Sequence, residues 1–434
     1  RAVFGAPKDV RDPHAFHKLS LVALLAWVGL GADGLSSSSY GPDEAFRALI
    51  DENGKAHIGL AVFLAIATAL TVFIISYGYS RIIEQFPSGG GGYVVASKIL
   101  GPRVGVVSGF LRRHTVTKLF GDMVVRLDPA RFELSMFHTA TIDDDVTKAL
   151  RARADHFELG ERTMPGWLHA IRNRELDVLV YLDIGMHAMM QALAAIRLAP
   201  RQYVLWGHPV TTGFAAIDAF LTSDAMEPPD GEKHYNERLV RLPRLGCAFA
   251  PPALEIVDPP ELANGDGRVE VFFAQSAFKI VPAFDDVLAR IAQRAPAVRF
   301  HFTPHAQSPA RRALRERLAR AFATRGLAFD DHAGLFRHVG EAEFLGVARA
   351  SHFSLDSMGW SGGVTTLEIL WHDAPVLTLP GKLMRGRHTS AMLDILELPE
   401  LVARDVDDYV ERAVRLATDA DWRDSLRARI RRSE

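Results

Sequence analysis

The pattern of hydrophobic and polar positions divides the chain into two parts of different character. Two long apolar runs, at residues 19–32 and 58–79, dominate the first hundred residues. After Gly109, short apolar runs of strand length alternate with longer amphipathic stretches that are typical of helices. Strands that alternate with helices predict a parallel sheet covered on both faces. We therefore expect an all-α hydrophobic segment joined to α/β domains.

The second apolar run, 58–79, predicts a membrane-spanning helix. It contains no charged residue, and its length suits a hydrocarbon core of about 30 Å. The run at 19–32 is followed by Asp33, and it fits either a broken membrane helix of the kind that lines a transporter site or the core of a signal peptide. The alternative for both runs is a buried hairpin of two core helices. We expect contact with a membrane through residues 19–79.

The rest of the chain predicts two α/β units. The first unit has strands expected at 104–107, 132–138 and 178–182, with helices at 116–127 and 143–155. The second unit has strands expected at 269–273, 298–302 and 376–379, with a helix at 282–294 and closing helices within 406–432. A stretch rich in proline, glycine and acidic residues separates the units and predicts a linker. The expected domains are 1–102, 103–250, the linker 251–267, 268–404, and the closing helices 405–434.

Charge and cysteine content narrow the possible partners. The formal net charge is −2, with a pI near 6.8, so the totals show no basic excess of the kind that nucleic acid requires. Cys247 is the single cysteine, which excludes an internal disulfide framework and a cysteine-based zinc site. We therefore expect no nucleic-acid partner and no cysteine-based metal site.

The stretch Asp356–Thr389 carries the strongest local signal in the chain. An apolar run ends at Leu355, a turn at Gly362 and Gly363 follows, and a helix is expected to start at Thr365. A glycine loop between a strand and a helix lies at the carboxyl end of a sheet and exposes free N–H groups, which suits a phosphate. The alternative is an ordinary βαβ crossover whose glycines only make a tight turn. The loop alone leaves both interpretations open.

Two resemblances to known families add to this pattern. The first lies in LLAWVGLGADGLSSSSYGPDEAF and SYGYSRIIEQFPSGGGGYVVASKILGPRVGVVSG, which resemble the opening of an amino-acid permease of the amino acid–polyamine–organocation superfamily. It covers two membrane helices and the approach to a third, whereas such transporters have about a dozen. We therefore carry no transport activity over. The string RVGVVSG suits both a third membrane helix and the first strand of the α/β part, so a natural fusion and an artificial chimera both stay open.

The second resemblance covers residues 103–432. GFLRRHTVTKLFGDMVVRLDPARFELSMFHT, DVLVYLDIGMHAMMQALAAIRLAPRQYVLWGHPVTTG, HYNERLVRLP, FFAQSAFKIVP and WSGGVTTLEILW resemble, in this order, bacterial relatives of the O-linked N-acetylglucosamine transferases, the SPINDLY-like group. The resemblance implies a GT-B glycosyltransferase fold, in which two Rossmann-like domains face each other across a cleft. It also implies inverting, metal-independent transfer of a sugar, N-acetylglucosamine first of all, from a UDP donor to a protein hydroxyl.

Donor, acceptor and location follow from this resemblance as expectations. A related branch glucosylates asparagine, so the sugar and the acceptor side chain stay open. The implied partners are a UDP-sugar and a protein or peptide acceptor, with no cofactor. The catalytic part is expected in the cytoplasm, and at a membrane if residues 1–102 are genuine. The alternatives are a permease fragment with an incidental soluble part and an inactive sugar-nucleotide-binding module.

The resemblance also assigns a donor site. A departing diphosphate needs a positive side chain and a helix N-terminus to stabilise its developing charge. Lys279 matches the family's diphosphate-binding lysine, the glycine–threonine loop matches the loop that holds the diphosphate, and Glu368 is placed to accept hydrogen bonds from the ribose. The full predicted donor set is Gln275, Lys279, Val339, Phe344, Gly362, Gly363, Thr365, Thr366, Glu368, Arg387, His388 and Thr389. Taken singly, Lys279 and Glu368 would be surface residues, and Val339 and Phe344, matched to the uracil segment, would be core residues.

Two residues of the first unit are the predicted catalytic residues. His114 matches the active-site histidine of the family, and a histidine pKa near 6.5 allows proton transfer at neutral pH. Asp183 follows a strand and could help to remove the acceptor's proton. The alternatives are a solvated loop histidine and an aspartate that caps the next helix. His187 and His208 are weaker candidates.

Two departures from the family pattern stand out. Val364 occupies a position where relatives commonly place His or Asn, which removes a polar contact from the donor loop. No tetratricopeptide repeats precede the catalytic region, although family members usually recognise protein acceptors through them.

Overall fold

The computed structural model describes residues 102–251, 254–259, 262, 267–303, 309–335 and 340–432, together with Val62, Phe63, Ile66 and Leu70. The chain divides into two compact units, Arg1–Ile99 and Leu100–Glu434. Apart from those four residues, the permease-like segment and both apolar runs lie outside the described residues, so the predicted span stays a prediction. Within the described part, no helix is both long and apolar enough to cross a membrane.

The first α/β domain is built on a parallel sheet. Across residues 102–251 the sheet has seven strands in the order β3-β2-β1-β4-β5-β6-β7. The strands are β1 (Arg103–Ser108), β2 (Glu133–His138), β3 (His156–Leu159), β4 (Val178–Tyr181), β5 (Arg201–Leu205), β6 (Ala219–Ser223) and β7 (Arg238–Leu242). The helices are α4 (Thr115–Val125), α5 (Asp145–Arg153), α6 (Met164–Arg172), α7 (Ala188–Ala194) and the 3-10 helix η1 (Gly231–His234).

The second α/β domain follows the same plan with a smaller sheet. Within its described residues the sheet has five parallel strands in the order β10-β9-β8-β11-β12. The strands are β8 (Val269–Phe273), β9 (Val298–Phe302), β10 (Ala333–Leu335), β11 (Phe353–Leu355) and β12 (Val376–Leu377). The α-helices are α8 (Asp285–Arg294), α9 (Pro309–Ala323), α10 (Phe329–His332), α11 (Glu341–Ala350), α12 (Val364–Trp371), α13 (His388–Ile395), α14 (Val406–Thr418) and α15 (Ala420–Arg432). The 3-10 helices are η3 (Ala277–Lys279), η4 (Pro282–Phe284), η5 (Met384–Gly386) and η6 (Pro399–Leu401).

Local sequence explains these elements. In β8, Val271, Phe272 and Phe273 are consecutive and fully buried, as expected of a parallel strand covered on both faces. Helix α14 begins after Asp405, whose carboxylate accepts a hydrogen bond from the N–H of Asp408 at 2.8 Å. Pro282 supports only a 3-10 turn, so the helix expected at 282–294 becomes α-helical at Asp285.

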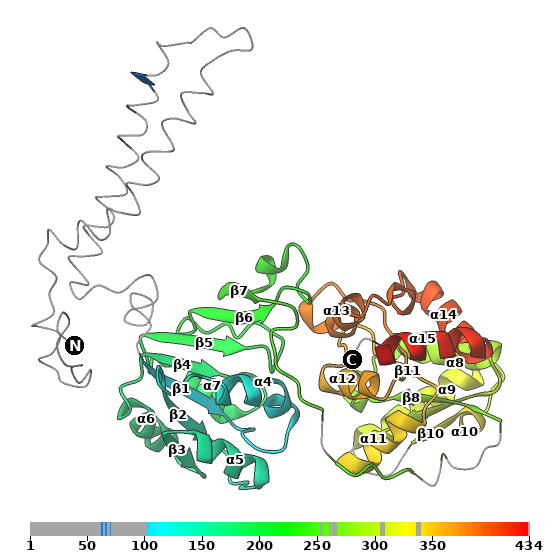
Figure 1. Cartoon of the computed structure of the whole chain (residues 1–434). Coiled ribbons are helices and arrows are strands. Elements are labelled where there is room, and N and C mark those ends of the chain that lie inside the picture. The colour runs from blue at the N-terminus through cyan, green and yellow to red at the C-terminus, as the bar shows by residue number, and fades with distance from the viewer. Residues whose placement is uncertain are drawn as a thin grey trace, which may run out of the picture. The chain divides into compact units, whose positions relative to one another are not determined.

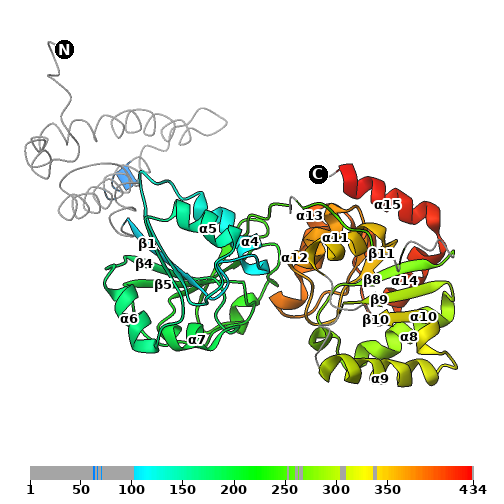
Figure 2. The ribbon, with the colours of Figure 1, turned by 90° about the horizontal axis from the view of Figure 1, so that it is seen from below.

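Helices cover both faces of each sheet (Figures 1 and 2). In Figure 2, α4 and α5 lie on one side of the first sheet, and α6 and α7 lie on the other. In the second domain, α11 packs with α12, and α8 packs with α9 and α14. The prediction of a parallel α/β protein with two sheets is therefore confirmed. The predicted domain boundaries stay predictions.

Strand order fixes where a ligand can bind. In the first sheet β1 lies between β2 and β4, and in the second β8 lies between β9 and β11. The order of the strands reverses beside β1 and beside β8, so the loops that leave the neighbouring strands diverge there. Ligands of open α/β sheets bind at the carboxyl ends of the strands at such a point. The loops after β1, β4, β8 and β11 are therefore the expected ligand-binding loops.

Candidate active site

The predicted site residues follow these four strand ends. His114 lies in the loop after β1, and Asp183 is the second residue after β4. Gln275 and Lys279 follow β8, and the glycine loop follows β11. Residues separated by 250 positions in the chain meet here, because Lys118 of α4 bonds to Glu368 of α12. The two sets of strand ends therefore contribute to a single region.

Asp356 organises the loop after β11, and sequence reasoning missed its role. Its Oδ1 atom accepts hydrogen bonds from Gln275 Nε2 at 3.1 Å and from the N–H of Gly362 at 2.8 Å. Its Oδ2 atom accepts from Ser361 Oγ at 2.6 Å and from Thr378 Oγ1 at 2.7 Å. The carboxyl group is fully buried, and burial raises its pKa. The signal in the sequence was an aspartate placed directly after a buried strand.

The glycine loop is compact because of Gly362. A Cβ atom at Gly362 would overlap Thr366 Oγ1 and would lie 2.9 Å from Thr365 Oγ1, so only glycine fits. The hydroxyls of Thr366 and Ser361 lie 3.0 and 2.8 Å from Thr389 Oγ1. The predicted residues Thr366 and Thr389 thus hold the loop to α13.

The start of α12 offers free hydrogen-bond donors. In the described part of the chain, no hydrogen bond uses the backbone N–H groups of Gly363, Val364 or Thr365. A helix leaves its first N–H groups without partners inside the helix, and they carry a partial positive charge. An anion is the ligand that such groups attract.

Three basic side chains gather around Trp360. Lys279 Nζ lies 5.6 Å from the centre of the indole ring, and Arg385 Cζ lies 5.2 Å from it. The ring of His208, from the first domain, lies 5.7 Å from the same indole. Burial lowers the pKa of Lys279, against the attraction of Asp356. The region is therefore electropositive. The sequence analysis did not predict a role for Arg385 or Trp360, although both lie in the stretch Asp356–Thr389.

His208 has a tightly defined position. Gly185 has φ +111°, and a Cβ atom there would lie 2.5 Å from His208 Cδ2, so a side chain at 185 would displace the ring. Burial lowers the pKa of His208, and the charges of Arg385 and Lys279 lower it further. The imidazole is thus held neutral beside two cations. His187 lies apart from this group, as the exposed N-cap of α7.

His388 and Arg387 link the two domains. The His388 ring is buried, 5.3 Å from the ring of Trp206 in the first domain. Burial lowers its pKa to about 3, and the charge of Lys279 contributes. Its Nδ1 atom has no hydrogen-bond partner in the described residues. Arg387 Nε donates to the carbonyl oxygen of Met226 at 3.1 Å, so in this structure it serves a domain contact. Contact of either residue with a donor stays a prediction.

Glu368 is buried, contrary to the alternative of a solvated position. Only 4% of the residue is exposed, and its Oε1 atom is ion-paired with Lys118 Nζ. Lys118 Nζ also lies 2.5 Å from Glu341 Oε1. Burial raises the pKa of Glu368, whereas Lys118 lowers it. A buried carboxylate with a dedicated cation is suited to accept hydrogen bonds from hydroxyl groups.

His114 is the N-cap of α4. Its Nδ1 atom accepts a hydrogen bond from the N–H of Val116 at 3.2 Å, and its ring stacks on Phe110 at 4.1 Å. Burial lowers its pKa to about 4, with further contributions from Arg112 and Lys118. The imidazole is therefore neutral at pH 7. Because Nδ1 accepts, the proton lies on Nε2, and the ring can donate a hydrogen bond but cannot take a proton without losing the cap.

Asp183 has the properties of a proton acceptor. The residue is fully buried, and neither carboxylate oxygen has a hydrogen-bond partner among the described residues. Burial raises its pKa to about 7, although the nearby Ser108 hydroxyl and Gly109 N–H oppose the shift. It caps no helix, because the N-cap of α7 is His187. A group with a pKa near neutrality at a strand end is suited to general base catalysis.

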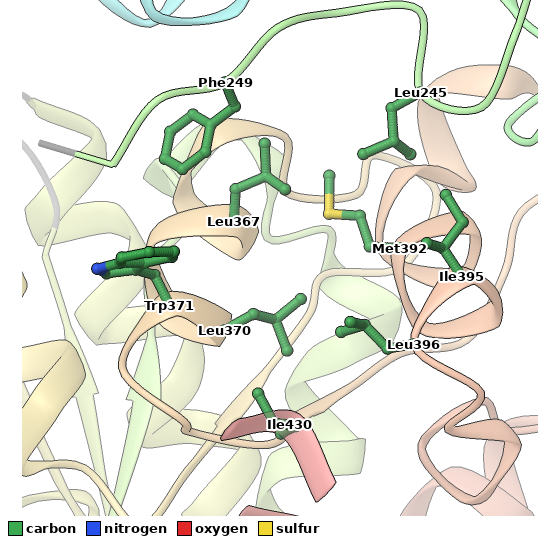
Figure 3. A pocket seen from close by; sticks show the side chains of 9 residues that line it. All are labelled: Leu245, Phe249, Leu367, Leu370, Trp371, Met392, Ile395, Leu396 and Ile430. Carbon is green, nitrogen blue, oxygen red and sulfur yellow. The ribbon is translucent and has the colours of Figure 1, made fainter. Parts of the chain in front are cut away.

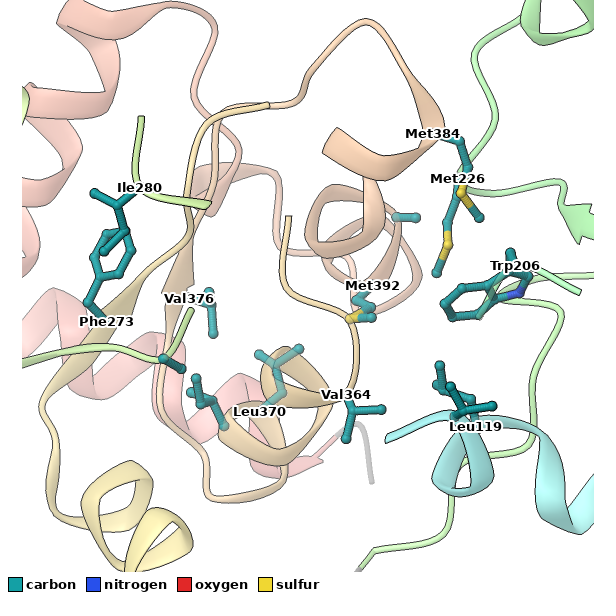
Figure 4. Packing of buried hydrophobic residues seen from close by; sticks show 14 of the residues in the cluster. Leu119, Trp206, Met226, Phe273, Ile280, Val364, Leu370, Val376, Met384 and Met392 are labelled. Atoms are coloured by element: carbon teal, nitrogen blue, oxygen red, sulfur yellow. The ribbon is translucent and has the colours of Figure 1, made fainter. Parts of the chain in front are cut away.

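The remaining predicted residues have other places. Val339 lies outside the described residues. Phe344 packs edge-on against Phe272 at 5.2 Å, as part of the core. Val364 is buried, and Figure 4 shows it beside Leu119 of the first domain. An apolar contact between the domains thus occupies the position where a polar residue was expected.

An apolar pocket lies next to this region but differs from it in chemistry. Its lining consists of apolar and aromatic side chains from the segment after β7, from α12, from α13 with the residue after it, and from α15 (Figure 3), namely Leu245, Phe249, Leu367, Leu370, Trp371, Met392, Ile395, Leu396 and Ile430. No cation lines it, so it is not suited to a diphosphate.

Known proteins resemble this chain in sequence. Residues 278–434 match the model of Glycosyl transferase family 41. The chain is 26% identical over 340 residues to a protein of Solanum lycopersicum described as probable UDP-N-acetylglucosamine–peptide N-acetylglucosaminyltransferase SPINDLY, covering 76% of this chain and 36% of that protein. It is 29% identical over 264 residues to the UDP-glucose:protein N-beta-glucosyltransferase of Actinobacillus pleuropneumoniae, covering 57% of this chain and 39% of that protein.

A solved structure extends the similarity to the fold. A mutant of the Thermobaculum terrenum O-GlcNAc transferase superposes with a TM-score of 0.67 at 30% identity, covering 77% of this chain and 64% of that chain. The first and second α/β domains therefore share the fold of that O-GlcNAc transferase. The class of fold is that of a glycosyltransferase, as the sequence predicted. The match to Glycosyl transferase family 41, residues 278–434, lies in the second domain and the closing helices. The chain spans about a third of the length of its SPINDLY relatives.

We predict that Asp356→Ala destabilises the fold far more than Asp356→Asn. Alanine leaves the Gly362 N–H and Gln275 Nε2 without an acceptor, at a cost of about 1–3 kcal/mol each. In Asp356→Asn the amide oxygen can keep those two fixed donors, while its NH2 donates to the hydroxyls of Ser361 and Thr378, which can rotate. Thermal unfolding of the three proteins measures the difference. Equal loss in both variants would show that the hydrogen-bond arrangement does not stabilise the loop.

Proposed function

We propose that this protein transfers a sugar from a UDP donor to a protein side-chain hydroxyl, with inversion at the anomeric carbon and without a metal ion. One observation carries the proposal: the cations Lys279 and Arg385 meet at Trp360 beside the free N–H groups that begin α12. Together they supply what a diphosphate needs, charge and directed hydrogen bonds. The relatives are described as enzymes that transfer a sugar from a UDP-sugar to protein or peptide, which supports the same chemistry.

The donor is expected to lie across the loops after β8 and β11. Its diphosphate contacts Lys279 and the N–H groups of Gly363, Val364 and Thr365. Its ribose hydroxyls donate to the carboxylate of Glu368. The neutral rings of His208 and His388 provide hydrogen-bonding groups next to the cations without adding charge.

The transfer step needs charge stabilisation and a proton acceptor. The acceptor oxygen attacks the anomeric carbon from the face opposite the diphosphate, and the bond between that carbon and the phosphate oxygen breaks. UDP leaves with the electron pair, and Lys279 and Arg385 stabilise the negative charge that develops. The hydroxyl proton of the acceptor passes to the Asp183 carboxylate. His114 donates a hydrogen bond from Nε2 to substrate and stays neutral.

We predict that Lys279→Ala weakens UDP binding by at least about ten-fold, because one charge-assisted hydrogen bond contributes about 1.5–3 kcal/mol. Isothermal titration calorimetry with UDP measures the effect. Binding of uridine, which has no phosphate, should hardly change. Lys382→Ala is the matched control, since Lys382 is an exposed lysine near the same loop. Undiminished UDP binding by Lys279→Ala would refute the assignment of this lysine.

We predict that activity rises with pH through about 7, because the Asp183 carboxyl must be ionised to take a proton and its pKa is raised to about 7. The measurement is kcat/KM for a UDP-sugar and a peptide acceptor between about pH 5.5 and about pH 8.5. This range extends about 1.5 units on either side of the Asp183 pKa. Asp183→Asn should lose most activity and keep UDP affinity. A full rate in this variant, with the same pH profile, would exclude Asp183 as the base.

A further inference from the structure

Lys118 joins the two domains through ion pairs at the predicted donor site. Lys118 on α4 carries its ammonium to the Glu368 carboxylate on α12, and also to Glu341 on α11 at 2.5 Å. The exposed fractions of the three side chains are 20% for Lys118, 5% for Glu368 and 22% for Glu341. Exposed ion pairs contribute little, whereas removing one partner of a buried pair leaves an uncompensated charge. Lys118 is therefore important to the ionisation of the Glu368 carboxyl group.

Buried apolar side chains lie on the same two helices as this ion pair. Leu119, next to Lys118, is buried, and so is Val364 at the start of the helix that carries Glu368. Figure 4 shows these two side chains facing each other, with Trp206 close by. Helices α4 and α12 are in contact here. Exclusion of water lowers the local dielectric and strengthens the interaction of Lys118 with Glu368.

Glu368 needs a cation to remain a carboxylate. Burial and the charge of Glu341 raise its pKa, and Lys118 is the group that lowers it. Glu341 also forms an ion pair with Arg113, and the Arg113 Nη1 atom lies 3.5 Å from the Glu341 Oε2 atom. The groups that face Glu368 are thus Lys118 from α4 and Glu341 from α11, with Arg113 behind them. An ionised carboxylate accepts two hydroxyl hydrogen bonds, whereas a protonated one has lost part of that capacity.

We propose that Lys118 is a positioning residue of the donor site, which holds the Glu368 carboxylate ionised and oriented to accept hydrogen bonds from the ribose hydroxyls of the UDP-sugar. The inference rests on the proposed function. It gives the first domain a part in donor recognition, through a residue that does not itself touch the donor. It also couples the two halves of the site, because the charge of Lys118 contributes to the neutral state of His114.

The test compares two ligands that differ only at the ribose. The full chain is titrated calorimetrically with UDP and with 2′,3′-dideoxyuridine diphosphate. For Lys118→Met, UDP binding should weaken about ten-fold, as for loss of a charge-assisted hydrogen bond, while binding of the dideoxy ligand changes less than about two-fold. Lys118→Arg should restore most of the UDP affinity. Lys148→Met, at an exposed lysine on the neighbouring helix α5, is the matched control and should bind both ligands normally.

A second readout separates positioning from mere structural support. In Lys118→Met, the loss of UDP affinity on lowering the pH should begin at a higher pH than in the unaltered chain, because Lys118 is the group that lowers the pKa of Glu368. Glu368→Gln should show no difference in this pH dependence with or without Lys118→Met. In the Glu368→Gln background, Lys118→Met should have no further effect on UDP binding.

Each alternative outcome is distinct. Equal weakening of both ligands in Lys118→Met would overturn the proposal, since it would indicate a structural role alone. Unchanged UDP affinity in Lys118→Met would overturn it too. Failure of the unaltered chain to bind UDP would refute the proposed function itself, and the role of Lys118 with it. That result is distinguishable from the two outcomes for Lys118→Met, because it is seen without any substitution.

Discussion

The glycine loop after β11 depends on the buried carboxyl group of Asp356. This group joins three segments at the carboxyl edge of the second sheet: the loop after β8 through Gln275, the glycine loop through Ser361 and Gly362, and the chain directly after β12 through Thr378. Tyr409 of α14 donates to the carbonyl oxygen of the same residue at 2.9 Å. The negative charge also attracts Lys279. One interaction therefore shapes the loop and sets the position of the cation that the proposed chemistry uses.

The electrostatics of the site follow from a division between cations and neutral rings. Lys279 and Arg385 meet at Trp360, while the pKa values of His114, His208 and His388 are all lowered by burial, so these rings stay uncharged. A site of this kind is positive enough for a diphosphate. It also keeps hydrogen-bonding groups that change little in charge near pH 7. Asp183 is the group whose raised pKa suits proton transfer there.

Sequence reasoning predicted the parts of this site that depend on local pattern. The strand–loop–helix at 353–371, Lys279 after β8 and the alternation of strands and helices are visible as runs, turns and spacing. Contacts between distant segments are not visible in this way. Asp356 and Arg385 lie in motifs that the sequence singled out, yet their roles depend on partners brought together by the sheet. Glu368 looked like a solvated helix residue because its cation, Lys118, lies 250 positions away. Several short elements, such as β3 and β10, were missed because their patterns are brief and only partly buried.

The central claim is that the strand ends of both domains form one UDP-sugar site. The most direct measurement is a crystal structure of the full chain with UDP bound. The account predicts the diphosphate within hydrogen-bond distance of Lys279 Nζ and of the N–H groups at the start of α12, with the ribose at Glu368. Diphosphate bound elsewhere, with the loop from Asp356 to Thr366 left free of ligand, would contradict it.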